Sequence, residues 1–313
     1  MKIIFLLPSF LWLSTLLAQQ TNLNSQSNWS LHKKELQFGL GATQFNGDLG
    51  GANSVGKDYS LKDLDWQSTG LAAWLGYRQR FHPNFATTTS LCVFNLMGND
   101  KYSEEAIRKA RNLNFRSFNL EIQQRFEFIF ASIEKFSPTF NLPGNYSKLN
   151  RSQQYYIFSG LGLIYFNSQG YYAPNDKWVN LRPLQTEGKT YLPFTLTVPA
   201  GVGFRFGISK VWRLGIELTY VKTFSDYIDD VSTVYKDPSD FQDPIASHLS
   251  NPSDLSVTQG NVNLFGAGFQ RGDSKQKDAY YHANIILSKN ITYKDYGLNR
   301  KKFLKKELEK NKL

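Results

Sequence analysis

The sequence has only one cysteine, Cys92, among 313 residues. One cysteine cannot form an internal disulfide, and this one lies too far from the N-terminus to be a lipid-modified N-terminal residue. Histidine is also scarce. The four present, His32, His82, His248 and His282, follow no metal-ligand spacing, and the sequence has no Gly-x-Ser-x-Gly nucleophile motif. These absences exclude a disulfide framework, and no pattern indicates a metal or another cofactor.

Long apolar runs are missing after residue 19. A membrane helix needs roughly 18 consecutive apolar residues, which disfavours a helical membrane protein. The first eighteen residues differ, because one lysine precedes an apolar stretch that ends at Ala18, before the polar "QQTNLNSQSN". This layout predicts a secretory signal peptide at residues 1–18, followed by a linker at 19–34. An uncleaved anchor is the alternative, although Pro8 and two serines interrupt the apolar span.

Eight segments of the remaining chain alternate apolar and polar residues with a period of two, which is typical of strands. Each is about 11 to 13 residues long, near the roughly 9 to 11 that a tilted strand needs to cross a bilayer. The sequence therefore predicts an all-β fold, an eight-stranded antiparallel transmembrane β-barrel over residues 35–293, in the cell outer membrane. The segments are 35–45, 70–81, 87–97, 118–130, 155–166, 194–206, 212–224 and 279–291.

The predicted connections alternate between short and long. Turns at 82–84 and 207–211 contrast with polar loops at 46–69, 98–114, 167–193 and 225–278, and this asymmetry is expected of short periplasmic turns and long outer loops. Residues 131–154 are long where a short turn is expected. They are either an inserted periplasmic loop or a missed pair of strands. Their Pro, Gly, Asn and Ser content does not alternate, which favours the insertion.

The polar faces of these strands predict a charged interior. An eight-stranded barrel is just wide enough to be filled by side chains, so the charges are expected to pair across it and close any channel. Glycines on the same faces leave room for them, and outward aromatics near the strand ends predict interfacial girdles. The predicted interior charges are Arg78, Arg80, Glu121, Arg125, Glu127, Arg205, Arg213 and Glu217, and the girdle residues include Phe81, Tyr155, Tyr165, Tyr220 and Phe224.

Part of the formal net charge of +10 is concentrated at the C-terminus, where residues 294–313 hold eight basic and three acidic side chains. A nucleic-acid partner is not expected for an exported chain. These residues are predicted to form a basic periplasmic tail that stays solvated or contacts an acidic surface.

The stretch "TFSDYIDDVSTVY" places Asp226, Asp229 and Asp230 just after a strand. Their spacing differs from that of a calcium loop with ligands at positions 1, 3, 5 and 12, although calcium binding through another geometry stays open. The stretch is predicted to form a structural lid on the barrel, with Arg182 as a candidate partner of the aspartates. In this prediction Val231 and Val234 pack inward, while Tyr227 and Tyr235 rest at the interface.

Four motifs follow one another along the chain: "FNGDLGG" at 45–51, "WVNLRPLQTEGKTY" at 178–191, "LTVPAGVGFRFG" at 196–207 and "FSDYIDDVSTVY" at 224–235. Together they resemble the PorG-like family of outer-membrane β-barrels of the type IX secretion system, over about residues 35–291. The resemblance implies a non-enzymatic small barrel, of the OmpX and OmpA kind, that anchors a periplasmic part of the secretion machine. Residues 131–154 and the basic tail depart from the family pattern.

The expected partners are therefore outer-membrane lipids and periplasmic or lipoprotein components of a secretion machine, without a nucleic acid. Two alternatives belong to other classes. An outer-membrane lipid-modifying enzyme would use His282 with a hydroxyl such as Ser288, and a surface barrel would bind a ligand through its outer loops. A histidine at the barrel rim is the simpler interpretation of His282.

Overall fold

The computed structural model describes residue 29 and residues 32–49, 66–103, 105–133, 152–209, 211–258 and 264–292. All eight predicted strands are present, because the alternation gives each strand one face for the interior and one for the outside. The strands are β1 Lys34–Asn46, β2 Gly70–His82, β3 Phe85–Asn99, β4 Asn114–Ile133, β5 Gln153–Tyr172, β6 Lys177–Asn180, β7 Phe194–Gly207, β8 Trp212–Thr223 and β9 Ala279–Asn290.

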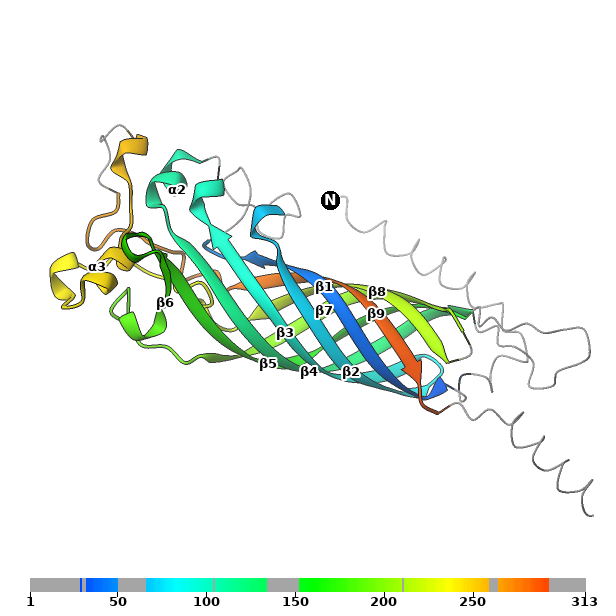
Figure 1. The fold of residues 1–313 in the computed structure, drawn as a ribbon. Coiled ribbons are helices and arrows are strands. Elements are labelled where there is room, and N and C mark those ends of the chain that lie inside the picture. The colour runs from blue at the N-terminus through cyan, green and yellow to red at the C-terminus, as the bar shows by residue number, and fades with distance from the viewer. Residues whose placement is uncertain are drawn as a thin grey trace, which may run out of the picture.

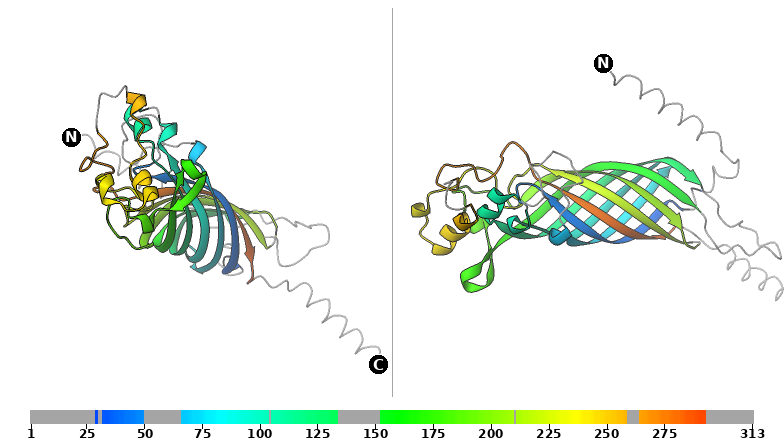
Figure 2. Two further views of the ribbon diagram at one scale, coloured as in Figure 1. Left: turned by 60° about the vertical axis from the view of Figure 1, so that its left-hand side comes forward. Right: turned by 90° about the horizontal axis from the view of Figure 1, so that it is seen from above.

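The eight long strands form a closed barrel in which neighbouring strands are antiparallel (Figures 1 and 2). β1 pairs with β2 on one side and with β9 on the other, where Phe38 lies opposite Leu287. β4 pairs with β5, and the sheet continues through β7 and β8 to β9. Closure leaves no free edge among these strands and confirms the predicted eight-stranded antiparallel barrel.

The strand that was not predicted is β6, a four-residue strand that pairs with the end of β5. Gly170 lies opposite Val179, so β5 and β6 form a hairpin that continues past the barrel wall. The segment "KWVN" is too short for its alternation to stand out from the loop around it. β4 and β5 are each 20 residues long, which is longer than the predicted segments at 118–130 and 155–166.

The connections gather at opposite ends of the barrel (Figure 1). The four long ones, which carry α2 Ala106–Arg111 and α3 Pro244–Ser250, share the end that we call the loop end. The turn after β2, the turn after β7, the end of β4 and the start of β5 share the opposite end, which we call the turn end. β4 ends at Ile133 and β5 begins at Gln153. The insertion between them is therefore shorter than the predicted 131–154.

Several predicted segments lie outside the described residues. They are the signal peptide at 1–18, all of the linker at 19–34 except residue 29 and residues 32–34, residues 134–151 of the insertion, and the basic tail at 294–313. Within the described ranges, no helix is long and apolar enough to cross a membrane.

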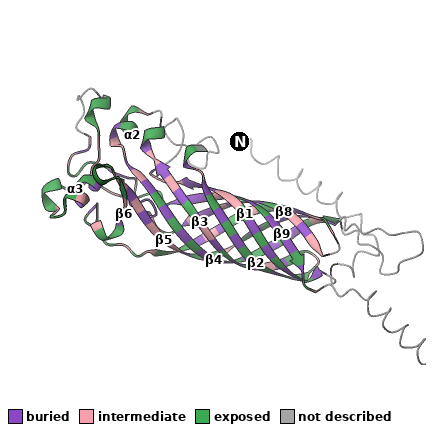
Figure 3. Cartoon of the chain, in the orientation of Figure 1, coloured by how far each residue is buried: buried purple, intermediate pink, exposed green. Residues whose placement is uncertain are grey.

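Burial alternates along most of the length of the long strands, so the barrel has an apolar outer wall and a mixed interior (Figure 3). On the wall, Leu40, Leu71 and Phe126 are 72%, 74% and 63% exposed. The predicted girdle residues face outward, and Tyr165 and Tyr220 contact the rings of neighbouring strands. In the interior, the charged residues lie toward the turn end. The largest hydrophobic cluster lies toward the loop end and includes Phe45, Phe94, Phe115, Phe166, Val221 and Tyr280.

A glycine on β7 makes room for one of the largest interior side chains. A Cβ atom at Gly203 would lie 2.2 Å from Cζ of Tyr156, which is far inside van der Waals contact. Tyr156 itself is 1% exposed. Only glycine at position 203 allows the tyrosine ring to cross this part of the lumen.

Candidate functional site at the loop end of the barrel

The segment 224–235 leaves β8 and folds over the loop end through a series of bends and turns. Its three aspartates are buried: Asp226, Asp229 and Asp230 are 2%, 1% and 2% exposed. Three aliphatic or aromatic side chains of the same segment, Ile228, Val231 and Tyr235, are buried as well. Buried carboxyl groups need hydrogen-bond partners, so the contacts of these aspartates define the site.

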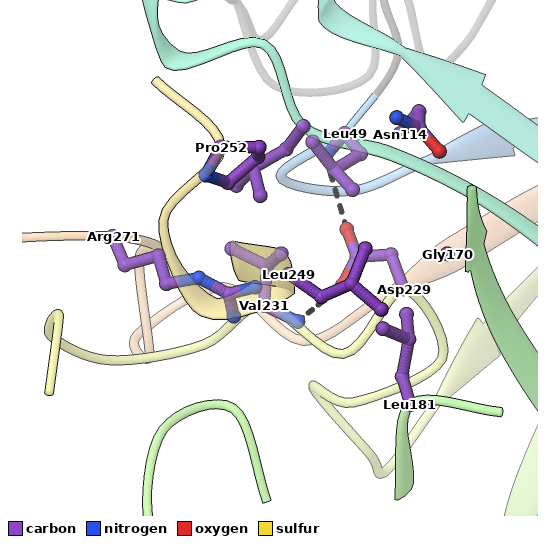
Figure 4. A pocket seen from close by; sticks show the side chains of 10 residues that line it. Leu49, Asn114, Gly170, Leu181, Asp229, Val231, Leu249, Pro252 and Arg271 are labelled. Atoms are coloured by element: carbon purple, nitrogen blue, oxygen red, sulfur yellow. Dashed lines mark hydrogen bonds between the residues drawn. The ribbon is translucent and has the colours of Figure 1, made fainter. Parts of the chain in front are cut away.

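Asp229 joins this segment to the connection after β1. Its Oδ2 accepts a hydrogen bond from the backbone N–H of Leu49 at 2.9 Å, and its Oδ1 accepts one from the N–H of Val231 at 3.0 Å. Figure 4 shows the two bonds reaching Asp229 from opposite sides. Leu49 belongs to "FNGDLGG" and Val231 to "FSDYIDDVSTVY", so two of the motifs that carry the family resemblance meet here.

Asp230 joins the same segment to the connection between β5 and β7. Its carboxyl oxygens accept hydrogen bonds from Oγ1 of Thr186 at 2.5 Å and from the hydroxyl of Tyr191 at 2.6 Å. Asp230 has φ of 66°, in the left-handed region that aspartate tolerates better than most residues. Tyr191 also stacks on Tyr227, with ring centroids 4.7 Å apart and an interplanar angle of 10°.

Glu187 is a fourth buried carboxylate of the site, and Arg271 is its cation. Glu187 accepts bonds from the backbone N–H groups of Ser232 and Thr233 at 2.9 and 3.0 Å. Nη1 of Arg271 lies 3.0 Å from Oε1 of Glu187 and 2.6 Å from the carbonyl oxygen of Asp230. Nε of Arg271 donates to the carbonyl of Ser250 at 3.2 Å, so one guanidinium joins three segments of the loop end.

Arg111, the last residue of α2, joins the connection between β3 and β4 to the others. It forms a bidentate pair with Asp100, with Nε 2.6 Å from Oδ2 and Nη2 2.8 Å from Oδ1. It also donates to the carbonyl oxygens of Asp48 and Arg271 at 2.8 and 2.9 Å. The four long connections are therefore held together by buried hydrogen bonds. We call this assembly of residues 45–49, 100–103, 105–113, 181–191, 224–235 and 264–278 the lid.

The carboxyl groups of the lid outnumber its arginines, and this affects their protonation. Burial raises the pKa of Asp230 to about 6, against the opposing effect of Arg271, and raises that of Asp48 to about 7. The pKa values of Asp229 and Asp278 lie well above the ordinary range, because of burial first and then of neighbouring carboxylates. The lid accordingly favours the protonated form of several carboxyl groups.

A small cavity of about 10 Å³ lies beneath the lid (Figure 4). Asp229 and Arg271 line it together with apolar side chains, among them Leu49, Leu113, Leu181, Val231 and Leu249. This volume is close to that of a single water-sized probe, which is far smaller than an ordinary small-molecule site. Across the described ranges, no group of three or more His, Cys, Asp or Glu side chains has an arrangement that could hold a metal ion.

The structure places the predicted lid residues differently in three respects. Arg182 is exposed, and the hydrogen bonds to the aspartates described above come from hydroxyl groups and backbone amides instead. Tyr235 is buried and packs against Phe265, although the sequence predicted it at the interface. Val234, predicted to pack inward, is 44% exposed. The segment bends at almost every residue, so the alternation of a strand does not apply to it.

Sequence analysis did not identify Arg271, Arg111, Asp48 or Asp278 as residues of the site. No motif marks the arginines, which lie in polar loops where many charges are solvated. Asp48 and Glu187 do fall within two of the quoted motifs, so the motifs themselves were the available signal for these carboxylates.

The predicted interior charges lie inside the barrel, and six of the eight form a network toward the turn end together with Glu35, which was not predicted. Most of their ion pairs connect strands that are not neighbours in the sheet. Arg78 of β2 lies 2.7 Å from Glu127 of β4, and Arg205 of β7 lies 3.3 Å from Glu35 of β1. The hydroxyl of Tyr156 donates to Glu217. The network comprises Glu35, Arg78, Arg125, Glu127, Arg205, Arg213 and Glu217.

Two of the predicted interior charges lie apart from this network. Glu121 accepts a hydrogen bond from Oγ1 of Thr197 at 2.6 Å, and its carboxylate forms none of the ion pairs above. Arg80 donates to the carbonyl oxygen of Pro83 and lies over the ring of Trp29, near the turn end. The expected pairing of charges across the interior is therefore not seen as an ion pair at Glu121, whose carboxylate accepts a hydrogen bond from a hydroxyl instead.

His282 lies in the interior, against buried residues of the hydrophobic cluster, and not at the exposed rim where the sequence predicted it. It is 4% exposed, and its ring packs edge-on against Phe94 and Tyr280, with centroid separations of 4.8 and 5.2 Å. Ser288, the hydroxyl considered with it, accepts a hydrogen bond from Gln37 farther along the lumen. The two side chains are not assembled as a base and a nucleophile.

No protein-family model matches the chain, and no curated protein matches it. Solved structures with similar folds include the Neisserial surface protein A (NspA), Ail, the attachment invasion locus protein of Yersinia pestis, and the N-terminal beta-barrel domain of Pseudomonas aeruginosa OprF. Their identities to this chain are 5%, 9% and 8%, and their TM-scores are 0.35, 0.34 and 0.28. Each comparison covers 82% of this chain and 97% of the other. Similarity at this level concerns the fold alone.

Proposed function

We propose that the chain is a non-enzymatic outer-membrane barrel that acts as a structural or assembly component. Its membrane location is supported by the outer wall, where apolar side chains face outward from all eight long strands. Aromatic side chains occur near both ends of this wall, where a bilayer has its interfaces. Phe81 and Phe85 lie toward the turn end, and Tyr165 and Phe194 lie toward the loop end.

The structural role is supported by one observation: the interior is closed both by ion pairs across the lumen and by the lid. Ion pairs span the lumen from strand to opposite strand, and the lid covers the loop end with buried hydrogen bonds. A pore needs a wet passage and an enzyme needs an accessible cleft, and these contacts support neither. A rigid barrel that is closed in this way is suited to presenting its ends to partners.

We further propose that the partners belong to a type IX secretion machine, as for a PorG-type anchor. Three motifs that carry this resemblance, "FNGDLGG", "WVNLRPLQTEGKTY" and "FSDYIDDVSTVY", contribute the contacts of one lid. The proposed contact region is the turn end, with residues 131–154 and the basic tail at 294–313. Most of these residues lie outside the described part of the chain.

Site-specific photocrosslinking from each end of the barrel would test this proposal. Ile133 ends β4 at the turn end and is 49% exposed, and Val234 of the lid is a matched position that is 44% exposed. A photoreactive residue at Ile133 is expected to capture periplasmic secretion proteins, and the same residue at Val234 is not. If a correctly inserted barrel yields no periplasmic partner from Ile133 or from the tail, the secretion role is excluded.

The lipid-modifying alternative has less support. His282 faces the lumen against two aromatic rings, so its imidazole does not reach the outer wall, where a lipid substrate would lie. Lipid profiles of a deletion strain, compared with those of a His282→Ala strain, test the remaining possibility. If both strains show the same change in lipid profile, and the His282→Ala barrel still folds, the enzymatic hypothesis would be restored.

A second candidate function, binding of a surface ligand, is favoured by one cluster beside the β5–β6 hairpin. Cζ of Arg116, an exposed residue, lies 4.4 Å from the ring centroid of Trp178, and its Nε donates to Gln169 at 2.9 Å. Tyr171 lies against the same tryptophan, at 5.4 Å. A guanidinium that is held in place in this way suits an anionic ligand. Loss of cell-surface binding of polyanions by Arg116→Ala, with Arg182→Ala as control, would support this candidate.

A further inference from the structure

A patch of polar side chains interrupts the apolar outer wall across β2, β3 and β4. The outward-facing residues of the patch are neighbours in register: Gln79 lies opposite Thr87, Tyr77 opposite Thr89, and Thr89 opposite Gln124. Gln79, Thr89 and Gln124 are exposed, and Tyr77 is 36% exposed. Oγ1 of Thr89 donates a hydrogen bond to Oε1 of Gln124. We call these five residues, Tyr77, Gln79, Thr87, Thr89 and Gln124, the wall patch.

Gln124 lies at the middle of the apolar wall. Along the outward face of β4, Phe118 lies six positions toward the loop end and Phe130 six positions toward the turn end. Both phenylalanines are more than half exposed, at 54% and 52%. If these rings mark the two sides of the hydrocarbon layer, the carboxamide of Gln124 lies near the bilayer centre.

A carboxamide at that depth is unfavourable in contact with lipid alone. Transfer of an amide without compensating hydrogen bonds into an apolar medium costs roughly 2–7 kcal/mol. Thr89 satisfies one end of the Gln124 side chain, and the other end still needs partners. On β8 and β9 the corresponding outward residues are apolar, among them Ile216, Leu218 and Ile285. The polar character therefore belongs to one side of the barrel.

We propose that the wall patch is a lateral interface with a second copy of this chain. Two copies inserted in the same direction can be related by a twofold axis along the membrane normal, which keeps each residue at the same depth as its counterpart and brings residues beside the axis face to face. A carboxamide is both donor and acceptor, so Gln124 of each copy can bond to the other. The surrounding Ile122 and Phe126, which are 52% and 63% exposed, supply apolar contact. This inference rests on the proposed membrane location.

Cysteine crosslinking in native membranes tests the interface. In the full chain, Gln124→Cys is expected to form a disulfide-linked homodimer on mild oxidation, because the residue would lie beside the twofold axis. Leu218→Cys, at a position 55% exposed on β8, is the control and is expected to stay monomeric. Cys92 is 2% exposed and therefore does not compete. A Gln124→Cys barrel that stays monomeric, or that crosslinks to a different protein, would overturn the proposal.

A measurement of affinity provides an independent test. In detergent or in reconstituted bilayers, Gln124→Leu is expected to raise the dissociation constant of the homodimer roughly 3- to 20-fold, which matches a typical hydrogen bond between membrane-embedded segments. Leu218→Ala should leave it unchanged, and heat-modified mobility on gels shows whether each barrel is folded. An unchanged constant for Gln124→Leu would contradict the role of the wall patch. Absence of the folded chain from the outer-membrane fraction would overturn the membrane location and the dimer together, whereas a membrane-inserted monomer overturns only the dimer.

Discussion

Arg125 of β4 and Glu217 of β8 meet across the lumen, with Nη1 of the arginine 2.9 Å from Oε2 of the glutamate. The two strands are separated by β5 and β7 in the sheet, so this contact ties opposite parts of the barrel together. Both side chains are buried, and Arg205 lies 3.6 Å from the other oxygen of Glu217. The barrel interior thus depends on charges that compensate one another.

We predict that Glu217→Ala destabilises the barrel by about 3–5 kcal/mol, because it leaves buried arginines without their carboxylate. Glu121→Ala is expected to cost less, about 1–3 kcal/mol, because it removes a hydrogen bond with the hydroxyl of Thr197 and no ion pair of the network. Heat-modified mobility on gels and urea unfolding in detergent measure both. If the two variants lose equal amounts of unfolding free energy, Glu121 is part of the charge network.

A second prediction concerns pH. The pKa of Asp48 is raised from 3.8 to about 7 and that of Asp230 to about 6, so the closed lid binds protons that an opened lid releases in this range. Stability of the lid must then fall as pH rises from about 4 to 7. Proteolysis of the lid is expected to be roughly 2- to 10-fold faster at about pH 8 than at about pH 5.

The control for this experiment is cleavage of an unfolded substrate by the same protease at each pH. Asp48→Asn should lose part of the dependence, because the amide does not titrate. A lid that is cleaved equally fast across the range, or faster at low pH, contradicts the prediction.

The barrel could be predicted from the sequence because each strand repeats one simple pattern. In β4, every second side chain from Phe118 to Phe130 faces outward and those between face inward, and the structure keeps this alternation throughout. The lid follows no such rule. Asp230 has a positive φ and the chain around it bends repeatedly, which is why Val234 and Tyr235 exchange the places expected of them.

The partners within the lid also could not be predicted. Arg271 reaches Glu187 across 84 positions of sequence, and Asp229 reaches Leu49 across 180. Such contacts follow from how four loops converge at one barrel end, and no local propensity encodes them. The aspartate cluster itself was visible, because three carboxyl groups so close together in sequence need partners wherever they are buried.

We predict that replacing Asp226, Asp229 and Asp230 together by asparagine loosens the lid. Each oxygen of Asp229 accepts a backbone N–H, and the amide group of asparagine would turn a donor toward one of them. Faster proteolysis of residues 173–193 and 224–278 on intact cells is the expected result. Asp240→Asn, at an exposed position in the same connection, is the matched control. Calcium chelation of the unmodified protein should leave proteolysis unchanged, and chelation that reproduces the effect of the triple change would establish a metal site.

The last prediction separates two arginines of the lid region. Arg271 is 2% exposed and donates to Glu187, to the carbonyl of Asp230 and to the carbonyl of Ser250, so Arg271→Ala removes the bonds that join three segments. Because Glu187 would remain buried without its cation, the closed lid should lose about 3–5 kcal/mol and be cleaved far faster by protease.

Arg182→Ala is the matched control, because this arginine is exposed and its removal should change stability by no more than about 0.5 kcal/mol. Arg271→Lys should restore little, since a single ammonium cannot reproduce contacts that leave one guanidinium in different directions. If Arg182→Ala opens the lid while Arg271→Ala does not, the aspartates are held by Arg182, as the sequence alone suggested, and the contacts of Arg271 contribute little to closing the barrel.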